Sequence, residues 1–142
     1  MSFSISVLFW AALVSGTVAA SIAFYGRYRM VPSWLTGPNI CKLEGGGCEA
    51  LFRTKRAALL GVPNSALALC LYGLLAIGRL GNFPVWILAA LCIPAVCMTV
   101  YLGWILIKEG LECRICWLGH FANAAIFALL LGSWAAESRF RN

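Results

Sequence analysis

The sequence contains few charged residues. Only 11% of its 142 residues are Asp, Glu, Lys or Arg, whereas 62% are hydrophobic. A soluble domain of this size needs a far larger polar surface to face water. The composition therefore excludes an ordinary soluble protein. It indicates an integral membrane protein that contacts lipid and has no nucleic acid as a partner.

Four long stretches lack charged side chains altogether, at residues 1–26, 57–78, 80–107 and 115–136. At 1.5 Å per residue, each is long enough to cross about 30 Å of hydrocarbon. The sequence therefore predicts one all-α domain over residues 1–142, an integral membrane four-helix bundle. We expect helices at about 4–25, 60–78, 83–107 and 113–135, and a cysteine-bearing capping loop, about 26–59, between the first two.

The first ten residues contain no Lys or Arg. A cleaved signal peptide is the competing interpretation, since Val18, Ala19 and Ala20 would make a passable cleavage site. However, a signal peptide normally begins with a charged region and has a shorter apolar run, whereas this run continues to Phe24 and Tyr25. We therefore expect the first segment to remain as a helix.

Three of the seven cysteines, Cys70, Cys92 and Cys97, lie well inside apolar stretches. A free cysteine in such a place behaves as a small hydrophobic residue, because a dry site disfavours the reactive thiolate. We expect no redox role for these three.

The other four cysteines lie at the ends of apolar segments. Cys41 and Cys48 are in the polar connection, and Cys113 and Cys116 form a C-R-I-C motif. If the four helices alternate in direction, the first and third connections emerge on the same side of the membrane. The sequence therefore predicts that the two cysteine pairs face each other.

The C-R-I-C motif is the more specific of the two. A thiol at a helix start meets the positive end of the helix dipole, which lowers its pKa and makes the thiolate a better nucleophile. Arg114, between the two cysteines, acts in the same direction, and Glu112 opposes it. In the loop, six residues with three glycines separate Cys41 from Cys48, enough to close a disulfide ring. This pattern favours redox chemistry and predicts no metal site.

Other interpretations of the four cysteines remain open. One is a structural zinc ion bound by all four thiolates, although the C-x6-C spacing is not that of a zinc knuckle. The other is a pair of structural disulfides, although a bridge between residues three apart is typically redox-active. In that case the chain would be a non-catalytic membrane subunit that holds a partner through its helices.

The order of motifs resembles the vitamin K epoxide reductase family. Paired loop cysteines come first, Gly61-Val62-Pro63 opens the second helix, and Cys113-x-x-Cys116 heads the last. The resemblance covers about residues 5 to 135. It implies a four-helix membrane bundle around a quinone pocket, closed by the cysteine-bearing loop. Bacterial members of the family are disulfide-forming quinone reductases.

The resemblance also implies roles for single residues. Cys41 and Cys48 match the shuttle pair, and Cys113 and Cys116 match the pair beside the quinone. Asn64 matches an asparagine that hydrogen-bonds a quinone carbonyl in animal members.

Two positions depart from the family pattern. Thr54 retains a hydroxyl where the family usually has serine, and His120 replaces a tyrosine of animal members. His120 follows Cys116 by one helical turn, so it can bond a quinone oxygen, accept the thiol proton or simply pack. We expect the Asn123 side chain to form a hydrogen bond between two helices.

From the same resemblance we expect a relay. A reduced thioredoxin-fold partner attacks the Cys41–Cys48 disulfide, the freed Cys48 attacks Cys113, and Cys116 delivers electrons to ubiquinone, menaquinone or vitamin K. A vitamin K epoxide or quinone reductase proper is the alternative activity. No thioredoxin-like segment follows residue 136, so the partner is expected to be a separate protein.

Charge counting and the resemblance disagree on orientation. The cysteine side carries eight Lys and Arg residues and the opposite side three, which favours a cytoplasmic active site. Most bacterial relatives have this site outside, where disulfides persist. Because a folded cap makes charge counting unreliable, we expect a bacterial inner-membrane protein with an extracytoplasmic active site.

Overall fold

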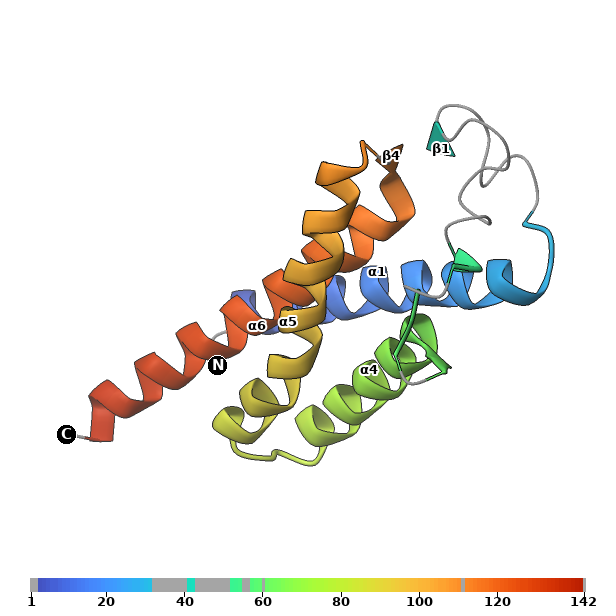
Figure 1. Cartoon of the computed structure of the whole chain (residues 1–142). Helices are drawn as coiled ribbons and strands as arrows, with labels where there is room; N and C mark the ends of the chain where they lie inside the picture. Colours follow the sequence, from blue (N-terminus) through green and yellow to red (C-terminus); the bar gives the residue numbers. More distant parts are fainter. Residues whose placement is uncertain are drawn as a thin grey trace.

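Four helices dominate the computed structural model, which describes residues 3–31, 41–42, 52–54, 57–59, 61–110 and 112–141. They are α1 (Phe3–Tyr28), α4 (Asn64–Leu80), α5 (Val85–Lys108) and α6 (Arg114–Arg141). Helices α1, α5 and α6 are each long and apolar enough to span a membrane. This is the expected helical membrane bundle (Figure 1).

Helix α4 is shorter than the sequence predicted. It has 17 residues and begins at Asn64 rather than near residue 60. At 1.5 Å per residue it extends for about 26 Å, slightly less than the hydrocarbon thickness. Proline disfavours the α conformation in the residue before it, so Pro63 prevents the helix from starting earlier.

Short strands, which the sequence did not predict, flank the helix starts. Strand β2 (Ala58–Leu59) pairs antiparallel with β3 (Val62–Pro63), directly before α4. Between them Gly61 has φ +86°, a left-handed conformation that glycine adopts at little cost. Strand β1 (Cys41–Lys42) pairs antiparallel with β4 (Glu112–Cys113), directly before α6. The β1–β4 ladder therefore lies at the cysteine end of the bundle, and the β2–β3 hairpin lies beside the start of α4 (Figure 1).

Helices α4 and α5 approach most closely near the turn that joins them. A Cβ atom added at Gly78 would lie 2.6 Å from Cδ2 of Leu88, so the Leu88 side chain would have to move if a larger residue stood there. From that turn the two helices diverge toward the cysteine end (Figure 1). In that half of the bundle, residues of both helices line a cavity.

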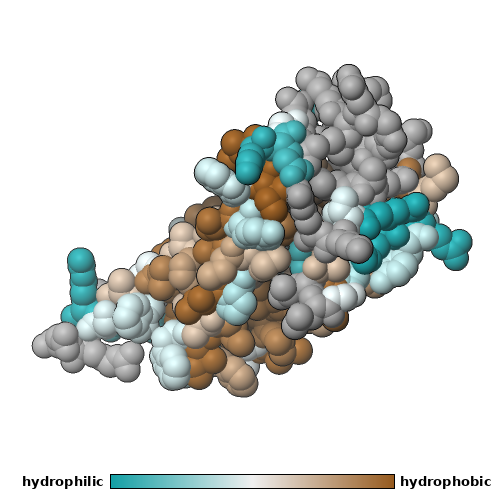
Figure 2. Space-filling view, viewed as in Figure 1, coloured by the Kyte–Doolittle hydropathy of each residue, from teal (hydrophilic) through white to brown (hydrophobic). Residues whose placement is uncertain are grey.

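The packed core lies between the helices, and the outer faces are apolar too. Phe9, Leu75, Leu88, Ile126 and Leu130 are almost completely buried. Large apolar side chains are nevertheless exposed on the outside, and Figure 2 shows this hydrophobic surface over the middle of the molecule. Such an exposed apolar surface suits contact with lipid tails. Close packing, rather than the hydrophobic effect, must then hold the helices together.

Candidate functional site

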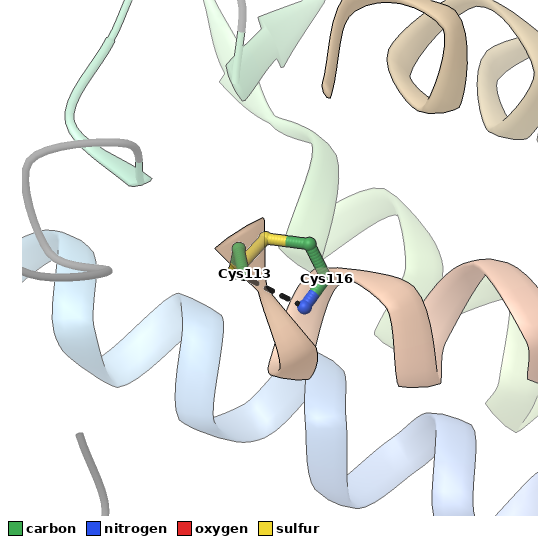
Figure 3. Close-up of a disulfide and its surroundings, with 2 residues drawn as sticks. All are labelled: Cys113 and Cys116. Atoms are coloured by element: carbon green, nitrogen blue, oxygen red, sulfur yellow. Dashed lines mark hydrogen bonds between the residues drawn. A yellow bond between two sulfur atoms is a disulfide. The ribbon is translucent and has the colours of Figure 1, made fainter. Parts of the chain in front are cut away.

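A disulfide joins the two cysteines of the C-R-I-C motif (Figure 3). Cys113 is the last residue of β4, and Cys116 lies in the first turn of α6, with 5.3 Å between their Cα atoms. The backbone N–H of Cys116 also donates a hydrogen bond to Sγ of Cys113, over 3.2 Å. The helix start therefore directs an N–H group at a sulfur, as expected for a motif that stabilises thiolate character.

The β1–β4 ladder brings the capping segment to this disulfide. Its register places Cys41 directly opposite Cys113, and Lys42 opposite Glu112. Directly opposed residues of an antiparallel pair have Cα atoms about 4.5–5.5 Å apart. The predicted approach of the loop to the C-x-x-C motif is thus present in the backbone. Cys48 lies outside the described residues.

Phe52 fixes another part of the capping segment to the bundle. Its side chain is only 6% exposed and packs in a cluster with Ala19, Leu106, Cys113 and Ile115. The Arg27 guanidinium also donates a 2.9 Å hydrogen bond to the Phe52 carbonyl oxygen. These contacts anchor the segment over the disulfide.

The anchor requires a glycine on α1. A Cβ atom at Gly26 would lie 2.9 Å from Cδ2 of Phe52. No local pattern in the sequence marks Gly26 or Phe52, because the two residues that make this contact are far apart in the chain.

A cavity of about 780 Å³ opens beneath the disulfide. Residues of all four helices and of the capping segment line it, and most of them are apolar. Cys116 is one of the lining residues, whereas Cys113 is not and is completely buried. The two sulfurs are therefore different: Cys116 borders the cavity, and Cys113 borders the cap.

The three other predicted site residues also line this cavity. Thr54 comes from the capping segment, Asn64 from the start of α4 and His120 from α6, one turn after Cys116. The His120 ring also makes an edge contact with Trp117, with 6.1 Å between the ring centroids. The structure thus brings together three polar side chains and one redox sulfur from distant parts of the sequence.

A second polar group lies further along the cavity wall. The Tyr72 hydroxyl donates a 2.7 Å hydrogen bond to Oδ1 of Asn123, and Nδ2 of Asn123 donates a 3.1 Å bond to Oγ1 of Thr99. The predicted interhelical role of Asn123 is confirmed. The sequence did not lead us to predict a role for Tyr72 or Thr99. A tyrosine in the middle of an apolar helix is nevertheless unusual, and this feature could have indicated Tyr72.

The three cysteines inside the apolar helices are free thiols and do not line the cavity. Cys92 is buried, and Cys70 and Cys97 are exposed on the outer surface. Within the described ranges, no three His, Cys, Asp or Glu side chains come close enough together to hold a metal ion.

These features define a class of protein: a helical membrane protein with a C-x-x-C disulfide at the wall of an apolar cavity. A family model described as the vitamin K epoxide reductase family matches residues 7–131, and the chain belongs to that family. Membership implies a membrane oxidoreductase that acts on thiols and disulfides or on quinones. Comparisons with curated proteins and with solved structures give no match.

Proposed function

We propose that the protein passes electrons from the thiols of a separate thioredoxin-fold partner to a membrane quinone, and so supports disulfide-bond formation. One observation carries the proposal: Cys116, one half of a C-x-x-C disulfide, lines a large apolar cavity inside a membrane bundle. A thiol pair in that position can exchange electrons with an apolar acceptor dissolved in the lipid.

The chemistry balances as a series of dithiol exchanges followed by one quinone reduction. The partner's two thiols reduce the Cys41–Cys48 disulfide and become a disulfide themselves. The thiols of Cys41 and Cys48 then reduce the Cys113–Cys116 disulfide by thiol–disulfide exchange. Finally the thiols of Cys113 and Cys116 give two electrons and two protons to the quinone, which leaves as a hydroquinone while their disulfide forms again.

The division between the two sulfurs supports this order. Cys113 borders the capping segment, opposite Cys41 in the β1–β4 register, so it is placed to receive the loop thiol. Cys116 lines the cavity, so it is placed to react with the quinone. We propose that Cys48 is the loop cysteine that attacks Cys113. Each exchange needs an in-line approach of sulfur to sulfur, so the cap must move during turnover.

The cavity walls suit a quinone substrate such as ubiquinone, menaquinone or vitamin K. Apolar side chains would enclose the ring, and a few polar groups would fix its orientation. Asn64, His120 and Thr54 supply polar groups to the same cavity as Cys116. We propose that Asn64 and His120 bond the quinone oxygen closest to Cys116, and that Thr54 closes the cavity from the cap.

We further propose that the protein lies in a bacterial inner membrane with the cysteines on the extracytoplasmic side. That side follows the family resemblance, since most bacterial relatives have the active site outside, where disulfides persist.

The proposal is tested by replacing Cys116 with serine. Purified protein receives a reduced thioredoxin-fold protein and either ubiquinone-1 or menaquinone-1, and the loss of quinone absorbance is followed. Cys116→Ser should abolish quinone reduction. Cys97→Ser is the matched control, since Cys97 is an exposed free thiol outside the cavity, and it should retain the wild-type rate.

The same experiment separates the proposal from its alternatives. A non-catalytic subunit would reduce no quinone in any variant, and its binding of a partner would not depend on Cys116. Reduction at the wild-type rate by Cys116→Ser would show that this thiol is not the one beside the quinone.

A further inference from the structure

One polar network connects three helices at the cavity wall. Tyr72 comes from α4, Thr99 from α5 and Asn123 from α6, and all three line the cavity. Their hydrogen bonds run in sequence from Tyr72 to Asn123, and from Asn123 to Thr99. The network therefore lies at the boundary between the helices and the cavity. Its orientation decides which of its polar atoms face a ligand in the cavity.

Helix α1 holds the network in place by close contact. A Cβ atom at Gly16 would lie 2.7 Å from both Cζ and Oη of the Tyr72 ring. The ring therefore occupies the space that a larger residue would fill, and Tyr72 is only 2% exposed. With its ring fixed against α1, the phenol has a defined direction toward Asn123.

The phenol in turn fixes the orientation of the Asn123 amide. Because Oδ1 accepts from Tyr72, Nδ2 lies on the side of Thr99, to which it donates one of its two N–H groups. A side-chain amide nitrogen has two N–H donors. Among the hydrogen bonds that the described residues make, the second N–H of Asn123 is not used, and this residue borders the cavity.

The position of Asn123 along α6 matches the dimensions of a single ring. Cys116, His120 and Asn123 follow one another at i, i+4 and i+7, so they form one stripe on the same helix face. At 1.5 Å per residue, His120 lies about 6 Å and Asn123 about 10 Å below Cys116. The step between His120 and Asn123 is therefore about 4.5 Å, comparable with the distance between the two oxygens of a 1,4-quinone.

We infer that Asn123 donates a hydrogen bond to the second oxygen of the quinone, the one farther from Cys116. This inference rests on the proposed function and adds a binding residue to it. Tyr72 and Thr99 are then positioning residues, which hold the amide with an N–H toward the ligand. The site selects 1,4-quinones, whose two oxygens lie at opposite ends of the ring.

The inference is tested with a 1,4-naphthoquinone that carries ¹³C at one carbonyl carbon at a time. Infrared difference spectra of the bound quinone resolve the stretch of each carbonyl, and a hydrogen bond lowers its frequency. In the wild type both stretches should be lower than in protein-free detergent. In Asn123→Leu one stretch should return to its detergent value while the other stays, and the quinone Kd should rise roughly five- to tenfold, as for one lost neutral hydrogen bond.

A second variant keeps the test decisive if Asn123→Leu does not fold. Tyr72→Phe retains the ring against Gly16 and removes only the phenol that orients the amide. It should broaden the same carbonyl band that Asn123→Leu moves, and leave the other band unchanged.

Failure of this inference can be told from failure of the proposed function. If the wild type reduces the quinone but neither variant alters a carbonyl band, Asn123 only packs the helices and the inference is wrong. If the wild type neither binds nor reduces the quinone, both the inference and the proposed function are wrong.

Discussion

Replacing Gly16 with alanine should destabilise the bundle and weaken quinone binding together. The added methyl group would lie 2.7 Å from Cζ and Oη of Tyr72 and 3.0 Å from Cβ of Ala122. Overpacking of this kind costs about 1–3 kcal/mol, and the displaced Tyr72 would also lose its bond to Asn123, a membrane hydrogen bond of about 0.6 kcal/mol. We expect a total loss of about 1.5–3.5 kcal/mol of stability.

The assay is reversible unfolding in mixed micelles with increasing denaturing detergent. Gly132→Ala is the matched control, since Gly132 also lies in a spanning helix but has no atom within 4 Å of an added Cβ. Because alanine is the better helix former, this control should change stability by at most about 1 kcal/mol, in the favourable direction. Gly16→Ala should unfold at a clearly lower detergent fraction.

A double variant identifies the cause. In a Tyr72→Ala background the ring that blocks the new methyl group is absent, so Gly16→Ala should cost less than it does alone. Equal midpoints for Gly16→Ala and Gly132→Ala would refute the reasoning, as would fully additive effects of Gly16→Ala and Tyr72→Ala.

Two further predictions concern the capping segment. A Cys41→Ser, Cys116→Ser variant retains Cys48 and Cys113 as its only site thiols, and oxidation should join them in a disulfide that mass spectrometry of the proteolytic fragments detects. Arg27→Leu removes the hydrogen bond that holds the cap to α1, so turnover with the thioredoxin-fold partner should slow at least about tenfold, since a hydrogen bond from a charged group contributes about 1.5–3 kcal/mol. Quinone reduction driven by a small dithiol should slow less, because the dithiol reaches the Cys113–Cys116 disulfide without the loop cysteines.

Each of these has its own contradicting result. If the first variant leaves both thiols free under oxidising conditions, and the reciprocal variant with Cys48 replaced forms a bridge from Cys41, then Cys41 rather than Cys48 attacks Cys113. For Arg27→Leu, the control is Arg29→Leu, because Arg29 is exposed beyond the end of α1. Equal slowing of the partner-driven and dithiol-driven reactions by Arg27→Leu would show that the hydrogen bond does not act through the cap.

The sequence predicted those features that depend on local periodicity. Charge-free stretches identified the helices, because lipid excludes charge along the whole length of a span. The i to i+4 spacing of Cys116 and His120 predicted that both lie on one face of α6, and both line the cavity.

The features that the sequence did not predict depend on contacts between distant residues. The sequence predicted that the capping loop approaches the C-x-x-C motif, but not the β1–β4 register that opposes Cys41 to Cys113, because neither two-residue strand is long enough to show a pattern. The network of Tyr72, Thr99 and Asn123 likewise requires knowledge of how three helices rotate about their axes.

The most direct test of the central claim is a single turnover of the fully reduced Cys41→Ser, Cys48→Ser variant, whose loop cannot reduce the Cys113–Cys116 disulfide again, with a quinone and no partner. Hydroquinone formation is followed by absorbance, and the Cys113–Cys116 disulfide is quantified by mass spectrometry after rapid alkylation. We predict that the two form together, in equal amounts, in this variant, and that adding Cys116→Ser abolishes both. Formation of the disulfide without hydroquinone, or of hydroquinone while Cys113 and Cys116 remain reduced, would contradict the claim that this pair passes its electrons to the quinone.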